Sequence, residues 1–190
     1  MTMPQPNKPF YRGQIKYGHQ ASLESGLRDG TITPRDKELI LEYLGERTVT
    51  KDLSISRVNK ITTHLVGWRR FLPVQYSDAS IADIYAAVTA LKNGTSTRGK
   101  PFSQNTIHDY IRILKPFLRW MSEEGYNELN LTKIKRIQAP PVDQDTKSPE
   151  DLITPKEIEQ LLEASKDLRN RAIIGVIYES GCRIGELGRL

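Results

Sequence analysis

The chain has 190 residues, of which 37% are hydrophobic and 27% charged, so it can bury a core and lacks the composition of a disordered chain. Its 28 basic and 23 acidic side chains leave a net charge of +5, which admits an acidic partner such as nucleic acid. The single cysteine excludes an internal disulfide and a cysteine metal cluster, and the longest apolar run, Ala172 to Tyr178, is too short to span a membrane.

Residues 1–32 contain scattered prolines and glycines and predict a polar N-terminal arm. The first firm helix start is Thr33, a capping residue, followed by Pro34 at the first helical position. Apolar residues then mark one face, and Gly45 is expected to end the helix.

Two further helices are predicted by apolar residues spaced three and four apart. The first of them extends from about Leu53 to Leu72, where Pro73 stops it. The second begins near Ser80 and reaches an end signal at Asn93 and Gly94. A polar loop is expected over 94–101.

Ser103 caps the most strongly amphipathic helix of the chain, which Gly125 is expected to end. Pro116 lies inside its apolar pattern and predicts a kink. Trp68 and Trp120 both fit apolar stripes, so we expect them in the core.

A short helix or turn is predicted over 131–137, and the Ala-Pro-Pro and Asp-Gln-Asp sequences of 138–153 predict a linker. A capping box at Thr154 opens a new unit over 154–190, with one helix after Thr154 and another from about Leu168 to Ser180. No strand pattern is evident, so the expected fold is all-α: a four-to-five-helix bundle over 33–137, a linker and the first helices of a second domain.

The positive charge is concentrated in the first part of the chain. Residues 1–150 hold 22 basic and 16 acidic side chains, a net of +6, whereas 151–190 hold 6 and 7. On each of two predicted helices the basic residues form a stripe beside the apolar one: Arg57, Lys60 and His64 on the second helix, and His108, Arg112, Lys115 and Arg119 on the fourth. Further basic residues lie in the polar loop, Arg98 and Lys100, and in the short helix, Lys133, Lys135 and Arg136. Such stripes can contact duplex phosphates, although a solvated basic face without a partner has the same pattern.

Near its C-terminus the chain combines an arginine and a glutamate at helical spacing. Arg183 follows Gly181, and Glu186 lies three residues further on. A guanidinium held by a carboxylate can bind one phosphate, but the same spacing also fits an ordinary surface ion pair.

The segment from Ile173 to Leu190, which contains Glu-Ser-Gly-Cys-Arg-Ile-Gly-Glu-Leu, resembles the first catalytic box of tyrosine recombinases, the phage integrase family. The helix after Thr154 is similar to the entry helix of that family's catalytic domain, and the helix from Ser103 to the last helix of its SAM-like core-binding domain. The resemblance covers about 33–190.

The resemblance implies that Arg183 contacts the scissile phosphate of duplex DNA and that Glu186 orients it, in a reaction that needs no metal or other cofactor. The family's later lysine, His-x-x-Arg box and nucleophilic tyrosine follow this box and have no counterpart here, so the chain alone is expected not to cleave DNA. It would bind DNA in the cytoplasm, without a membrane, and self-association on DNA would belong to a full-length protein.

Two alternatives belong to other classes. One is a stand-alone helical DNA-binding regulator that competes for recombinase sites. The other is a helical protein-interaction module with an incidental basic face. Loss of DNA affinity with rising salt separates both DNA-binding interpretations from the interaction module.

Overall fold

A computed structural model describes residues 18–96, 99–144 and 148–188, which group into two units, 18–143 and 144–188. In these residues the chain is mainly helical, and the one pairing of extended residues is an isolated bridge between Thr95 and Pro101. The prediction of an all-α chain is confirmed for the described part. No helix within it combines the length and the apolar content that crossing a bilayer requires.

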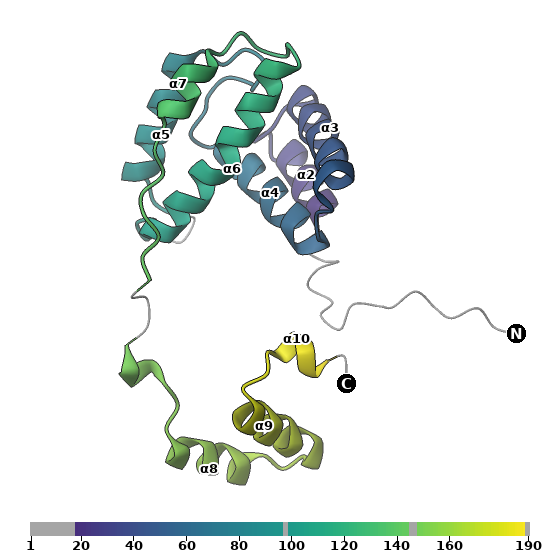
Figure 1. Cartoon of the computed structure of the whole chain (residues 1–190), viewed down its shortest axis with the longest axis vertical. Helices are drawn as coiled ribbons and strands as arrows, with labels where there is room; N and C mark the ends of the chain where they lie inside the picture. The colour runs from purple at the N-terminus through teal and green to yellow at the C-terminus, as the bar shows by residue number, and fades with distance from the viewer. Residues whose placement is uncertain (1–17, 97–98, 145–147, 189–190) are drawn as a thin grey trace, which may run out of the picture. The chain divides into compact units, whose positions relative to one another are not determined.

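Six helices build the first unit: α2 His19–Arg28, α3 Pro34–Lys51, α4 Ile55–Trp68, α5 Ile81–Asn93, α6 Gln104–Glu123 and α7 Leu131–Arg136. Helix α6 lies between α2, α3 and α4 on one side and α5 and α7 on the other (Figure 1). Its apolar stripe is buried, with Phe117, Leu118 and Met121 fully enclosed. Trp68 and Trp120 are 1% and 6% exposed, as predicted for core residues.

The helix starts follow from local sequence. The hydroxyl groups of Thr33, Ser80 and Ser103 each accept a hydrogen bond from the backbone N–H three residues later. These bonds satisfy N–H groups that have no partner within a helix. Helix α6 continues through Pro116, although proline there lacks the N–H that a helix interior uses.

The expected N-terminal arm is wrong for the residues that the structure describes. Instead, α2 packs against α4 and buries Leu23, and the turn after it buries Ile32. Gly26 permits this close approach, because a Cβ there would lie 2.9 Å from Val66 Cγ1. Helix α2 was not predicted because its short apolar face is interrupted by polar residues. Residues 1–17 lie outside the described part.

Two predicted helix ends also differ. Gly45 does not end α3, which continues to Lys51 and stops where Asp52 takes a left-handed conformation. A glycine in a helix costs only about 1 kcal/mol, so tertiary packing can override it. Helix α4 ends at Trp68, and Leu72 is buried from the segment that follows.

The first unit extends past the predicted boundary at residue 137. Nδ1 of His108 lies 2.6 Å from the Pro140 carbonyl oxygen. Asn105 exchanges two hydrogen bonds with the backbone of Asp143, at 2.8 and 2.9 Å. The first residues of the predicted linker are therefore held along α6.

The second unit contains the 3₁₀ turn Pro149–Asp151 and the helices α8 Pro155–Ala164, α9 Leu168–Ser180 and α10 Ile184–Leu187. Thr154 and Glu157 form the predicted capping box of α8. Among the described residues of this unit, Ile158 is the one buried apolar side chain, at 8% exposure. Tyr178 lies at the end of the apolar run that begins at Ala172, yet it is 46% exposed.

Candidate nucleic-acid interface

The basic residues of α4 and α6 meet on one surface of the first unit. Lys60 Nζ lies 2.7 Å from a carboxylate oxygen of Asp109 and links the two helices. The His64 ring packs 4.6 Å from the Tyr110 ring, and its Nδ1 lies 2.8 Å from the Lys60 carbonyl oxygen. Burial is the main reason that the pKa of His64 lies below its usual value. Lys60 and His64 thus contact α6 as well as lining the surface.

Arg57 and Arg112 flank this ion pair on the same surface. Arg57 lies one turn before Lys60 on α4, and Arg112 lies one turn after Asp109 on α6. Both side chains are exposed, and neither forms an ion pair within the described part of the chain. We call the surface formed by Arg57, Lys60, Asp109 and Arg112 the α4–α6 surface.

The other predicted residues of α6 contact the chain itself. Lys115 Nζ donates to the carbonyl oxygens of Lys135 and Ile137, at 3.1 and 2.5 Å, and so stabilises the C-terminal end of α7. Arg119 Nε lies 2.7 Å from a carboxylate oxygen of Glu123. The contact of His108 with Pro140 turns that side chain toward the linker. Contacts within the chain thus orient these three side chains, although that of Arg119 stays exposed.

The predicted DNA-contact residues outside α4 and α6 are exposed wherever the structure describes them. Lys133, Lys135 and Arg136 follow one another closely on α7, and Lys100 lies in the loop before α6. Arg98 lies outside the described residues. The backbone N–H of Ser96 donates a hydrogen bond of 2.7 Å to the carbonyl oxygen of Lys100 and brings these two loop residues together. Gly99, next to Lys100, has a φ of 74°.

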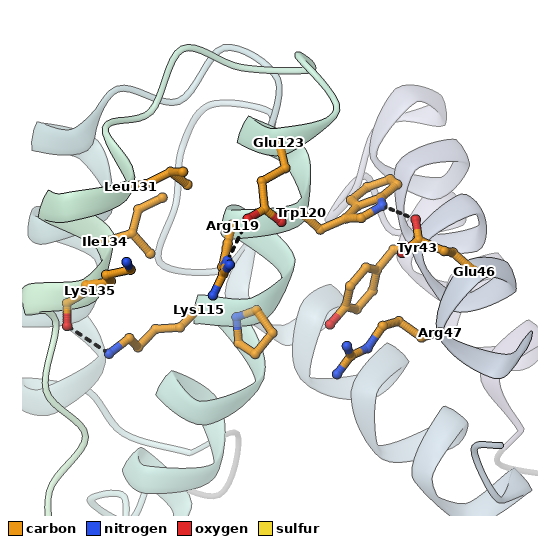
Figure 2. Close-up of a pocket in the computed structure, with 11 residues that line it drawn as sticks. Tyr43, Glu46, Arg47, Lys115, Arg119, Trp120, Glu123, Leu131, Ile134 and Lys135 are labelled. Atoms are coloured by element: carbon orange, nitrogen blue, oxygen red, sulfur yellow. Dashed lines mark hydrogen bonds and ion pairs between the residues drawn. The ribbon is translucent and has the colours of Figure 1, made fainter. Parts of the chain in front are cut away.

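A pocket of about 450 Å³ lies between α3, α6 and α7 (Figure 2). Its polar lining combines residues that the sequence placed in the basic stripes with residues of α3 that it did not: Lys115, Arg119 and Lys135; Tyr43, Glu46 and Arg47. Glu46 and Arg47 were missed because the helix was expected to end at Gly45, whereas Tyr43 was assigned to its apolar face. A signal existed, since Tyr43 and Arg47 are spaced four apart and share a helix face.

In the second unit, Arg183 and Glu186 are adjacent but not paired through their side chains. The Glu186 carboxylate accepts a hydrogen bond of 2.8 Å from the backbone N–H of Arg183 and caps α10. The expected ion pair with the guanidinium is absent from the described contacts. Gly181 ends α9 with a φ of 63°, which turns the chain just before Arg183.

This arrangement can bind phosphate electrostatically at two places. The first unit offers many positive side chains over several helices, and the second offers Arg183, which is exposed on a capped turn. Among the described residues, neither place presents the pairing of a nucleophile with a base that covalent catalysis uses. Comparisons with family models, curated proteins and solved structures found no match to this chain.

Proposed function

We propose that the chain binds duplex DNA through its first unit and is the N-terminal part of a tyrosine-type site-specific recombinase. The α4–α6 surface carries the DNA-binding part of this proposal. There Arg57 and Arg112 present positive charge that no carboxylate neutralises in the described residues, on helices that the Lys60–Asp109 pair holds together. Unpaired arginines on adjacent helices release counterions from DNA when they contact its phosphates.

The recombinase part rests on the spacing of Gly181, Arg183, Glu186 and Leu187 and on the domain order. The second unit exposes apolar side chains along its helices, among them Leu161, Val176 and Ile184. This exposure supports the proposal that these helices form a core only together with further elements. In this proposal Arg183 contacts the phosphate that is cleaved, Glu186 fixes its backbone, and the residues for strand exchange come from elsewhere.

Duplex binding is tested by removing the charge of two arginines at a time, in two matched double variants. Fluorescence anisotropy with a labelled duplex of mixed sequence, measured from about 50 to 200 mM salt, gives the affinity and its salt slope. Arg57→Ala with Arg112→Ala should weaken binding and reduce the slope by about 1.8, because two phosphate contacts are lost. Arg28→Ala with Arg35→Ala removes the same charge from α2 and α3, away from this surface, and should leave the slope unchanged.

Failure of the unaltered chain to bind duplex DNA at low salt would overturn the DNA-binding proposal. Equal losses in the two double variants would show a general effect of net charge and would remove the α4–α6 surface from it. The recombinase part has a separate test in the DNA sequence after the codon for Leu190. A reading frame there with a His-x-x-Arg box and a later tyrosine supports it, and an authentic stop codon supports the regulator.

A further inference from the structure

The pocket between α3, α6 and α7 carries more positive than negative charge on its walls. Four basic side chains line it, Arg47, Lys115, Arg119 and Lys135, against two carboxylates, Glu46 and Glu123. Its volume of about 450 Å³ falls within the range of roughly 300–1,000 Å³ that is usual for ligand sites. The pocket is therefore large enough for an anion and has the charge to attract one.

Both carboxylates already have partners inside the pocket wall. Glu46 accepts a hydrogen bond of 2.6 Å from the indole N–H of Trp120, and Glu123 accepts one of 2.7 Å from Arg119 Nε. Figure 2 shows these two contacts on the α3 and α6 sides of the pocket. Neither carboxylate pairs with Arg47, Lys115 or Lys135 among the contacts of the described residues. The positive charge of these three side chains is left for another partner.

Arg47 has an unsatisfied donor at this site. Its Nε is buried and has no hydrogen-bond partner, and its guanidinium carbon lies 5.7 Å from the centre of the Tyr43 ring. The ring holds the guanidinium on the α3 wall, from which it points across toward α6 (Figure 2). Buried N–H groups are nearly always paired in folded proteins, so this one calls for an acceptor that the chain does not supply.

The opposite wall carries hydrogen-bond donors that the chain itself leaves unused. Lys115 uses two of its three N–H groups on the carbonyl oxygens of Lys135 and Ile137, which fixes its position at the pocket edge. Arg119 uses Nε on Glu123, and its two terminal nitrogens have no contact described. The guanidinium group of Arg47 on one wall and the ammonium group of Lys115 on the other can both donate hydrogen bonds to the oxygens of one phosphate.

The pocket also adjoins the α4–α6 surface. On α6, Arg112 of that surface lies one turn before Lys115 of the pocket lining, and α3, which carries Tyr43 and Arg47, packs against α4. We infer that the pocket receives one phosphate of the DNA backbone, with Arg47 as its main donor and Lys115 on the opposite wall. This inference rests on the proposed function and adds to it a phosphate site that no basic stripe contained.

The first test uses inorganic phosphate and the full chain without DNA. The ¹⁵N–¹H signals of arginine Nε groups are followed by NMR while phosphate replaces chloride at constant ionic strength. The Arg47 signal, assigned by its loss in Arg47→Lys, should shift and saturate. The Arg35 signal, from an exposed residue of the same helix that also lies over a tyrosine ring, should not. An unshifted Arg47 signal would overturn the phosphate site.

The second test separates backbone phosphate from free phosphate. Arg47→Gln should lower the salt slope of duplex binding by about 0.9, the value for one phosphate contact, whereas the matched control Arg35→Gln should not. If duplex binding is normal and the two variants behave alike, the inference fails while the proposed function stands. If Arg47 binds inorganic phosphate but the slope is unchanged, the pocket takes a free phosphate and the DNA assignment fails.

A third arm covers two remaining outcomes. Should Arg47→Gln prevent folding, as judged by circular dichroism, Lys135→Gln tests the exposed edge of the same pocket and should also reduce the slope. An unchanged slope in that folded variant contradicts the inference. Absence of any duplex binding by the unaltered chain would contradict the proposed function, and the phosphate titration would then decide the anion site alone.

Discussion

The carboxylate of Asp36 joins three segments of the first unit at a fully buried position. It accepts hydrogen bonds from the backbone N–H groups of Thr33 and Tyr76, both at 2.9 Å, and pairs with Arg69 Nε at 2.8 Å. Arg69 in turn donates to the carbonyl oxygens of Leu72 and Val74. One residue thereby fixes the start of α3 and the irregular segment between α4 and α5.

Asp36→Ala should lower the free energy of unfolding by about 3–5 kcal/mol, because it leaves a buried guanidinium without its counter-charge. Urea unfolding followed by circular dichroism measures the change. Glu38→Ala is the matched control on the same helix. Glu38 pairs with Arg35 on the surface, where an ion pair contributes at most about 1 kcal/mol. Similar losses in both variants would show that the buried network does not stabilise this unit.

Single residues differ in how far the sequence could predict them. The caps Thr33, Ser80, Ser103 and Thr154 were predictable, because each bonds to an N–H three residues away. The Asp36–Arg69 pair joins residues 33 apart, and nothing in the local pattern selects those partners. The same limit applies to Arg47, whose importance depends on residues of α6 and α7.

At the scale of elements, strong amphipathic patterns predicted helices well and weak ones did not. The position of α6 followed from its long apolar stripe. Helix α2 was missed because few of its residues are apolar, and its burial depends on the fit of Gly26 against Val66. The basic stripes were predicted as exposed surfaces, yet Lys60, His108 and Lys115 bind parts of the same chain. Periodicity gives the face of a helix but not what covers it.

The attachment of 139–143 to α6 can be tested at one residue. Asn105→Ala removes both hydrogen bonds to the backbone of Asp143. The Asp143 amide should then exchange with solvent about fivefold faster in hydrogen-exchange NMR, since a net hydrogen bond contributes about 1 kcal/mol. Asn93→Ala, at the exposed end of α5, should leave this amide unchanged. An unchanged rate in Asn105→Ala would mean that α6 does not hold the segment.

At the scale of the whole molecule, the two units differ in how much core they bury. The first buries a continuous cluster in which the centre of the Phe117 ring lies 5.3 Å from that of Tyr43 and 4.9 Å from that of Tyr76. The second buries one apolar side chain among its described residues, Ile158, and exposes the following: Leu152, Ile153, Leu161, Leu168, Val176, Tyr178 and Ile184. The difference was not predictable from the sequence, because the apolar patterns of α8 and α9 resemble those of buried helices.

This difference predicts how the units behave when separated. A fragment of residues 13–143 should unfold cooperatively on heating, with a midpoint close to that of the whole chain. A fragment of 144–190 should show weak helical signal and no cooperative transition, because chains below roughly 70–80 residues seldom fold without a substantial core. Circular dichroism melts and the dispersion of one-dimensional NMR spectra measure both. A cooperative melt of the shorter fragment would show that it reaches a stable fold by itself, and loss of the transition in 13–143 would show that the first unit depends on the second.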